Sequence, residues 1–278
     1  MQLRPPLSEF ERARLTIVTD GEPDDLIALL LLQQAGWLAK AQIIANGWRD
    51  PQTKAAFIQK TLRLAADQIY VGLPSALDFS YGNASAHAFP PWQPELFCDA
   101  LVICLAPPRE LLRTDAALLR SSALALYGGF NLRCLLDEGV AAAQLLALLD
   151  AFDRVLYYEA QFAVGDSAVH DPTLLDALPA GVLRAIAAWN QHAQRYGGKI
   201  AASIAACPRQ FVNADTGLVA TLLMAQPACR LVPARIDLVD LGNYEPCADG
   251  RLLVVVGQDP AALAQQQIAW MRERLDAQ

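Results

Sequence analysis

The sequence has little charge, little lysine and no long hydrophobic run. Charged residues make up 18% of the 278 residues and hydrophobic residues 54%. A disordered chain has the opposite balance, so the composition excludes that class. The longest apolar stretch, residues 26–32, ends at two glutamines and is far shorter than the ~18 residues that a membrane span needs. The hydrophobic excess therefore predicts a soluble protein with a large core and no membrane partner.

Basic residues are scattered, and the net charge is −7. Proteins that bind nucleic acid usually carry a basic face, so no nucleic-acid partner is expected. The six cysteines show neither zinc-site spacing nor the density of a disulfide framework, which is typical of small buried thiols in a reducing compartment. The first residues of the chain lack the apolar stretch of a signal peptide, and this predicts a cytoplasmic location.

Strand-like and helix-like segments alternate over the first part of the chain. The predicted strands are residues 14–19, 41–45, 68–71, 101–105, 122–127 and 154–158, and the predicted helices are 24–36, 51–66 and 140–152. Such alternation is typical of an α/β fold with a doubly wound, mostly parallel sheet and helices on both faces. We expect one domain over residues 1–278, with residues 1–13 as an N-terminal extension.

After residue 171 the character of the sequence changes. The predicted elements are helices at 173–196, 215–224 and 259–275 and strands at 229–239 and 251–256, which can pair antiparallel. Residues 73–94 have no periodicity and predict a long loop. In a sheet of this kind, ligands bind in the loops at the carboxyl ends of the strands.

Three carboxylates follow the first predicted strand within six residues. Asp20 comes directly after the strand, and Asp24 and Asp25 open the next helix. Like charges this close raise one another's pKa, and a hard divalent cation such as Ca²⁺, which binds six to eight oxygen atoms, would offset the repulsion. The alternative is structural, because acidic turns commonly cap helices and Asp24 can act as the N-cap. The position of Asp20 at the functional edge of the sheet favours the metal site.

The D-x-x-x-D-D pattern of residues 20–25 resembles the calcium-binding signature of the inosine-uridine nucleoside hydrolases. Later segments resemble motifs of that family in the same order, over about residues 14–275. They are residues 41–77 (its second strand, following helix and vG.P strand), 101–112 (its GPLTN turn), 124–130 (its MGG strand end), 130–143 (its EFN…DPEAA segment) and 211–223 (its HDPLAVAYLL segment).

The resemblance implies a Ca²⁺ ion held by Asp20, Asp24, Asp25, Asp215 and the backbone carbonyl of Leu105. It implies that Asp20 is the general base, which deprotonates a metal-bound water that attacks C1′ of a ribosyl group. Asp24 and Asp215 would also contact the ribose hydroxyls. The implied reaction is hydrolysis of the N-glycosidic bond of a nucleoside or a related ribosyl compound.

The resemblance also implies that Asn131 hydrogen-bonds the ribose of a small ribonucleoside-like substrate, and that the chain forms a homodimer or homotetramer. His170 and Asp171 spell the family's HDP motif with the proline that follows, but the segments around Asp215 match the family better. His170 and Asp171 are therefore interpreted as residues that cap a helix.

The sequence departs from the family pattern at several positions, two of which bear on catalysis. Ala214 stands where the family has a histidine that is the leaving-group acid in some members, and Gly129 stands in place of a glutamate. The residues that could replace the missing acid are His87, Tyr158, Glu159, Trp189, His192 and Tyr196. Two alternatives to the hydrolase therefore stay open: a degenerate protein that binds a ribosyl ligand or partner without turnover, and a different hydrolase on the same kind of sheet.

Overall fold

The computed structural model describes residues 14–47, 49–75, 88–158, 168–169, 172–193, 210–212, 214–224, 229–236, 244–248, 250, 252–257 and 260–275. Several residues named above lie outside these ranges: His87, Glu159, His170, Asp171, Tyr196 and the N-terminal extension 1–13.

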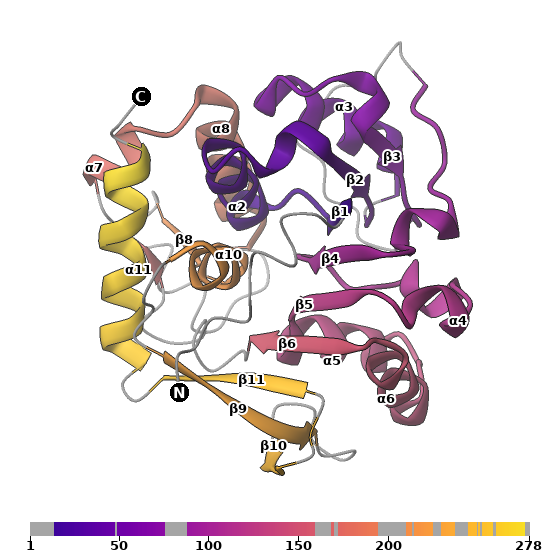
Figure 1. Cartoon of the computed structure of the whole chain (residues 1–278). Helices are drawn as coiled ribbons and strands as arrows, with labels where there is room; N and C mark the ends of the chain where they lie inside the picture. The colour runs from indigo at the N-terminus through magenta and orange to yellow at the C-terminus, as the bar shows by residue number, and fades with distance from the viewer. Residues whose placement is uncertain are drawn as a thin grey trace.

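The described strands form a nine-stranded sheet (Figure 1). The strands are β1 (Arg14–Thr19), β2 (Ala41–Ala45), β3 (Ile69–Val71), β4 (Ala100–Cys104), β5 (Ala123–Tyr127), β6 (Arg154–Tyr158), β9 (Cys229–Ile236), β10 (Tyr244–Pro246) and β11 (Leu252–Gly257). Their order is β10-β9-β11-β6-β5-β4-β1-β2-β3. All neighbours pair in parallel except β9, which is antiparallel to both β11 and β10. A separate antiparallel pair joins β7 (Ala168–Val169) to β8 (Phe211–Val212).

The chain changes direction across the sheet between β1 and β4. From β1 it moves outward through β2 and β3, and then returns to the other side of β1 and continues through β4, β5 and β6. Val18 near the end of β1 therefore pairs with Ile44 of β2 on one side and Cys104 of β4 on the other. Such a reversal opens a crevice at the carboxyl ends of the two central strands, which is where open α/β sheets bind ligands.

Helices cover both faces of the sheet (Figure 1). The described helices are α2 (Pro23–Gln34), α3 (Pro51–Leu62), α4 (Ala116–Leu119), α5 (Gly128–Asp137), α6 (Ala142–Ala151), α7 (Pro172–Asp176), α8 (Ala180–Ala193), α10 (Asp215–Leu223) and α11 (Pro260–Leu275). One core contains side chains of α2, α3, α7, α8, α10 and α11, and the other contains side chains of α4, α5 and α6. Within the described part of the chain, every helix is too short or too polar to cross a lipid bilayer.

Alternate residues of the central strands enter opposite cores. Ile17 and Ile43 point into the first core, and their neighbours Val18 and Ile44 point into the second. Because both faces are covered, side chains of either orientation are buried and mostly apolar, and all four of these are fully buried. This explains why the sequence is so rich in hydrophobic residues.

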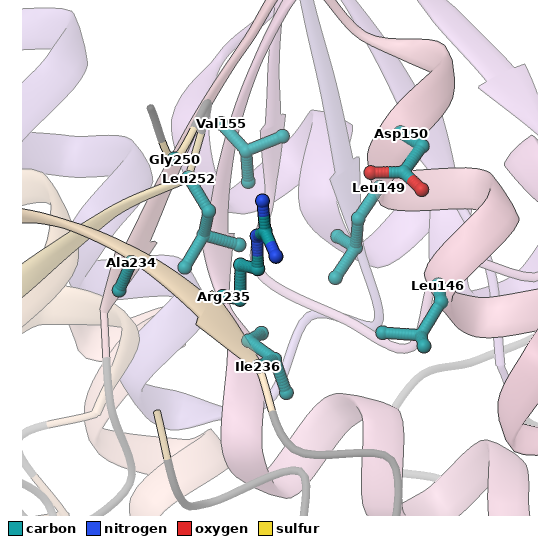
Figure 2. Close-up of a pocket in the computed structure, with 9 residues that line it drawn as sticks. All are labelled: Leu146, Leu149, Asp150, Val155, Ala234, Arg235, Ile236, Gly250 and Leu252. Carbon is teal, nitrogen blue, oxygen red and sulfur yellow. The ribbon is translucent and has the colours of Figure 1, made fainter. Parts of the chain in front are cut away.

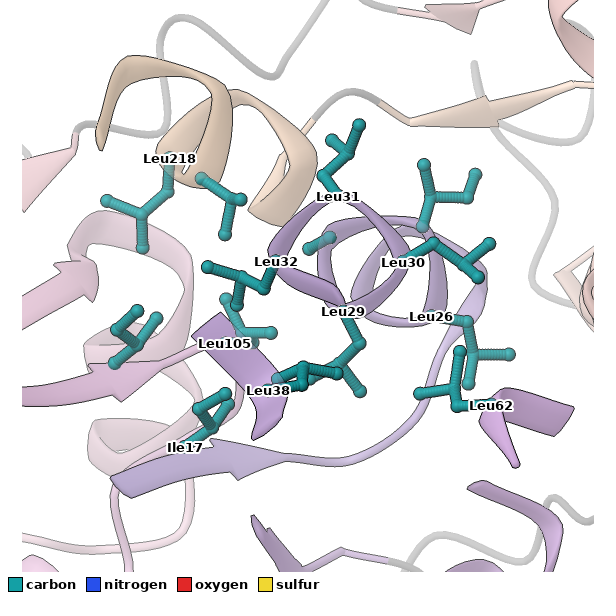
Figure 3. Packing of buried hydrophobic residues seen from close by; sticks show 14 of the residues in the cluster. Ile17, Leu26, Leu29, Leu30, Leu31, Leu32, Leu38, Leu62, Leu105 and Leu218 are labelled. Carbon is teal, nitrogen blue, oxygen red and sulfur yellow. The ribbon is translucent and has the colours of Figure 1, made fainter. Parts of the chain in front are cut away.

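Helix α2 lies at the centre of the first core. It is apolar on all sides, and residues 26–32 are buried, as expected for a helix surrounded by other elements. It packs against α3, α8, α10 and α11. Figure 3 shows its leucines between Leu218 of α10 and Ile17 of β1. The tight packing fixes the helix end that carries the first acidic residues.

The structure confirms the predicted α/β fold, the mostly parallel sheet and the antiparallel pairing of β9 with β11. It also resolves the predicted helical region that starts near residue 173 into α7 and α8. The prediction that Asp24 is the N-cap of its helix is wrong. Pro23 occupies the first helical turn and sets the start of α2, so Glu22 is the N-cap and makes no side-chain capping bond.

Other element boundaries are also corrected. The helix predicted over 51–66 ends at Leu62, because Arg63 adopts a left-handed conformation with φ of 55°. Helix α5 and strand β10 were not predicted. The prediction that the cysteines are buried thiols is confirmed only for Cys104, since the other four described cysteines, all free, are half-buried.

Candidate metal centre

The loop after β1 is folded around the carboxylate of Asp25. The Thr19 hydroxyl donates a hydrogen bond to Asp25 Oδ1 at 2.6 Å, and the Asp20 amide donates to the same oxygen at 3.2 Å. The Gly21 amide donates in turn to Thr19 Oγ1 at 3.0 Å. These bonds fix the backbone that carries Asp20 at the carboxyl end of β1.

The same loop has a further bond of its own and one to α8, and the segment after β2 approaches it closely. The Glu22 amide donates to Asp20 Oδ1 at 3.4 Å, and Trp189 of α8 donates its indole N–H to Glu22 Oε2 at 3.0 Å. After β2, Gly47 has φ of 73°, and a Cβ atom at that position would lie 3.0 Å from Asp20 Cβ. A larger residue there would therefore push against Asp20.

Asp215, the first residue of α10, meets the acidic loop although it lies about 190 residues further along the chain. Its amide donates to Asp24 Oδ2 at 3.5 Å. One carboxylate oxygen from each of Asp24, Asp25 and Asp215 lies within 4.8 Å of the other two. Asp25 is 1% exposed and Asp215 4% exposed, while Asp24 is partly buried. The packing of α10 against α2 brings the three carboxylates together.

The three carboxylates fit a hard divalent cation. Two oxygen ligands of one Ca²⁺ ion, each at about 2.4 Å, lie no more than about 4.8 Å apart. Asp215 Oδ1 is buried, and no hydrogen-bond partner for this oxygen is found among the described residues. A buried carboxylate oxygen without a partner is costly, and a cation would satisfy it. The donors are all oxygen atoms, which Ca²⁺ and Mg²⁺ prefer.

The electrostatics point the same way. Burial raises the pKa of Asp24 to about 6, and repulsion from Asp20 adds to the shift. Burial and the neighbouring carboxylates also raise the pKa values of Asp25 and Asp215 well above their usual range. For Asp20, burial raises the pKa, and the positive charges of Lys54 and Arg109 oppose that shift. A bound cation would favour the ionised form of all four carboxylates.

The structure places the other predicted site residues next to this group. The Leu105 amide donates to Val18 O at 2.9 Å, which brings the end of β4 beside the end of β1. Asn131 of α5 is buried and donates its amide N–H to Leu105 O at 3.2 Å. A carbonyl oxygen has two lone pairs, so Leu105 O can still accept a second ligand.

Asp20 stands apart from the closest three carboxylates. Among the described residues, the group whose carboxylate oxygens lie within 4.8 Å contains Asp24, Asp25 and Asp215 but not Asp20. Asp20 is adjacent, because its backbone amide binds Asp25 Oδ1. Of the four predicted carboxylates, three therefore converge, and Asp20 lies beside them.

Lys54 is a site residue that the sequence analysis missed. It lies on α3, is fully buried, and interacts electrostatically with Asp20, Glu22 and Asp25. Burial lowers its pKa to about 7, against the attraction of those three carboxylates. A signal was available, since Lys54 shares the apolar face of its helix with Ile58 at helical spacing.

A buried polar cluster joins the ends of β2 and β4. Asn46 donates its side-chain N–H to Glu110 Oε2 at 2.9 Å and to Pro107 O at 3.1 Å. The Leu73 amide donates to Glu110 Oε1 at 2.6 Å. Asn46 and Glu110 are both fully buried. These contacts hold the segment after β4 in place. They join residues far apart in the sequence, so no regular sequence pattern predicts them.

Three of the candidates for the missing leaving-group acid, Tyr158, Trp189 and His192, lie in the described part of the chain. Ala214 is buried beside Asp215 and has no proton to donate. Tyr158 is fully buried, and its hydroxyl exchanges hydrogen bonds with Gln267 of α11 at 3.3–3.4 Å. Trp189 binds Glu22, as described above. His192 lies in the last turn of α8 and is half-buried.

A cavity of about 340 Å³ lies away from the acidic group, between α6 and strands β6, β9 and β11 (Figure 2). Val155 and Leu252 on its wall are near the starts of β6 and β11, at the amino edge of the sheet. The acidic group lies at the opposite, carboxyl edge. The charged side chains on the wall are Asp150 and Arg235. The cavity therefore does not belong to the candidate metal centre.

Comparison with solved structures finds the fold of a nucleoside hydrolase, whereas comparison of sequences finds no match. An "Inosine-Guanosine Nucleoside Hydrolase (IG-NH)" is similar over 95% of this chain and 98% of its own, with 11% identity and a TM-score of 0.53. The inosine-uridine preferring nucleoside hydrolase from Bacillus anthracis is similar over 94% of this chain and 99% of its own, with 14% identity. Its TM-score of 0.38 is too low to support an argument. No family model and no curated protein matches the sequence. At these identities, the likeness establishes the fold alone.

Proposed function

We propose that the protein is a Ca²⁺-dependent N-ribohydrolase and a divergent member of the inosine-uridine nucleoside hydrolase family. The observation that carries this proposal is the convergence of Asp24, Asp25 and Asp215 at the carboxyl edge of the sheet, with a buried, unpartnered oxygen on Asp215. The substrate is a nucleoside or a related ribosyl compound. The fold likeness supports this choice over other hydrolases.

The ion would be held by Asp20, Asp24, Asp25, Asp215 and the carbonyl oxygen of Leu105. Three of these residues already have carboxylate oxygens within 4.8 Å of one another. A bound Ca²⁺ ion supplies positive charge that binds ribose hydroxyls and lowers the pKa of a water molecule.

Each proposed role fits the chemistry of its side chain. Asp20 accepts a proton from the attacking water, and the nearby charges of Lys54 and Arg109 favour the ionised form that a base needs. Asp24 and Asp215 bind ribose hydroxyls, and Asn131 donates a hydrogen bond to the sugar. The water oxygen forms a bond to C1′, the C1′–N bond breaks, and the nucleobase leaves with the bonding electron pair.

The leaving base receives no proton from residue 214, because this residue is alanine. We therefore expect an aryl riboside with a good leaving group to react faster than inosine. Leaving-group protonation by a positioned acid typically contributes about 10²-fold or more to the rate, so the difference should be of that order. Equal rates for the two compounds would mean that another residue supplies the acid.

The test is ribose release from a panel of nucleosides, with Ca²⁺ and then with EDTA. We expect release with Ca²⁺ and none with EDTA. D20N should lower kcat on the order of 10²–10⁴-fold, whereas D67N, at an exposed acid, should leave it unchanged. The absence of release from every substrate, in the wild type as in D20N, would contradict the proposal.

The second candidate is a protein that binds a ribosyl ligand without turnover. One observation favours it: residue 214, beside Asp215, is a buried alanine, which cannot protonate a leaving group. Calorimetry separates the two functions. Saturable binding of Ca²⁺ and a nucleoside, with no ribose released, would support the binding protein.

We further propose that the chain acts in the cytoplasm as a homodimer or homotetramer, on a small substrate, with no nucleic-acid or membrane partner. The net charge of −7 supports the exclusion of nucleic acid. We take residues 1–278 as one domain in which residues 1–13 form an extension. Light scattering coupled to size-exclusion chromatography tests the oligomeric state, and a monomer would contradict it.

A further inference from the structure

Lys54 occupies an unusual position for a lysine. It lies in the first half of α3 and is fully buried, and it is among the largest side chains in the described structure with no exposed surface. Lysine is almost never fully buried unless anionic groups compensate its charge. The burial of Lys54 therefore requires a partner of opposite charge.

The side chain of Lys54 runs along the acidic loop. Gly21, between Asp20 and Glu22, has φ of 63°, and a Cβ atom there would lie 2.9 Å from Lys54 Cδ and 3.1 Å from Ile58 Cδ1. Glycine at this position thus allows both the left-handed turn and the close approach of the lysine stem. The contact places the stem of Lys54 against the turn that presents Asp20.

Three carboxylates interact with the Lys54 ammonium group. They belong to Asp20, Glu22 and Asp25, all on the loop between β1 and α2 or in the first turn of α2. Burial raises the pKa of Asp20, and among the effects that lower this pKa the charge of Lys54 is the largest. The chain itself therefore supplies a basic side chain to this loop, next to the residues proposed to hold Ca²⁺.

We propose that Lys54 is a positioning residue, an internal counter-cation that keeps the acidic loop folded without bound metal and lowers the affinity of the site for Ca²⁺. The inference rests on the proposed metal site. Its two effects have opposite signs. Removal of the charge leaves carboxylates uncompensated in the metal-free protein, and it also removes a cation that repels Ca²⁺.

The test uses K54M, which keeps an unbranched chain against Gly21 but removes the charge. The matched control is K60M, at an exposed lysine on the same helix. We expect K54M to unfold at a lower urea concentration than wild type in EDTA. By calorimetry, the Kd of K54M for Ca²⁺ should be about threefold tighter or more, which a packing defect alone would not produce. K60M should match wild type in both measurements.

A Ca²⁺ Kd for K54M that is weaker than or equal to that of wild type would overturn the proposal. If K54M does not fold, the double variant D20N/K54M takes its place. Neutralising one of the facing carboxylates should restore folding, and failure to do so would also overturn it. If wild type itself binds no Ca²⁺, the proposed metal site has failed, and that result is distinct from an unchanged Kd in K54M.

Discussion

Asp25 and Asp215 are two buried carboxylates of the same cluster, but the chain surrounds them differently. Asp25 is 1% exposed and accepts hydrogen bonds from the Thr19 hydroxyl and the Asp20 amide. Asp215 is 4% exposed, and its Oδ1 has no hydrogen-bond partner within the described part of the chain. Burial raises the pKa of both groups. The first carboxylate is an organising centre of its loop, while the second has an oxygen left available to a ligand.

This difference separates stability from binding within one site. A carboxylate that satisfies two buried donors contributes to the fold whether or not a metal is present. A carboxylate with an unfilled oxygen costs free energy until a ligand occupies it. Substitutions at the two positions should therefore affect the protein in different ways.

The largest effect is expected for D25A. The change leaves the Thr19 hydroxyl and the Asp20 amide without their acceptor, and the loss of two such bonds should lower the free energy of unfolding by about 3 kcal/mol. Urea denaturation in EDTA measures it. D25N keeps an acceptor oxygen and removes a charge that burial disfavours, so these two effects should limit its loss to about 1 kcal/mol or less. The control is D137A, at an exposed position. Equal losses of stability in D25A and D25N would contradict the role of Asp25 in organising its loop.

Ca²⁺ itself should stabilise the wild type by nearly as much. A ligand that binds only the folded state adds about 2.7 kcal/mol at a free concentration of 100 Kd. Thermal melts at increasing Ca²⁺ concentration measure this gain as a rise in Tm. D215N should lose the rise, because the unpartnered oxygen belongs to Asp215. A full rise in Tm for D215N would show that Ca²⁺ binds elsewhere.

Most of the fold could be predicted from the sequence because its strands are buried on both faces. Continuous apolar segments such as residues 101–105 mark central strands, and their alternation with helices predicts a parallel sheet. Helix α5 could not be identified because it begins at two glycines, which weaken a helical pattern. Boundaries set by backbone conformation, such as that at Arg63, leave no clear periodic signal.

The candidate site could be predicted where it is local in sequence. Asp20, Asp24 and Asp25 lie within six residues. Asp215 came only from the family resemblance, since its approach to Asp24 depends on the packing of α10 against α2. Lys54 was missed because a lone lysine on a helix normally faces solvent, and its helical spacing from Ile58 is a weak signal of burial by itself.

The position of Asp215 also depends on a buried network behind α10. Gln267 of α11 donates to Gly217 O at 3.1 Å and to Thr221 Oγ1 at 3.2 Å. Q267M should lower the free energy of unfolding by about 2 kcal/mol and weaken Ca²⁺ binding, because α10 loses contacts that hold it. Q265M, at an exposed glutamine on the same helix, is the control for urea denaturation and calorimetry. Unchanged Ca²⁺ affinity in Q267M would show that α2 alone positions Asp215.

The smallest effect is expected for D215N in EDTA, and its sign is the sharpest test of the comparison. A carboxyl whose pKa is raised in the folded protein destabilises the fold at pH values above its unfolded pKa, because folding then disfavours its ionised form. Asparagine has no such charge. D215N should therefore gain about 1 kcal/mol in free energy of unfolding at pH 7 without metal, while D25A loses stability under the same conditions. The gain should disappear below about pH 4, where the unfolded carboxyl is also protonated. A loss of stability in D215N at pH 7 would mean that Asp215, like Asp25, supports the fold itself.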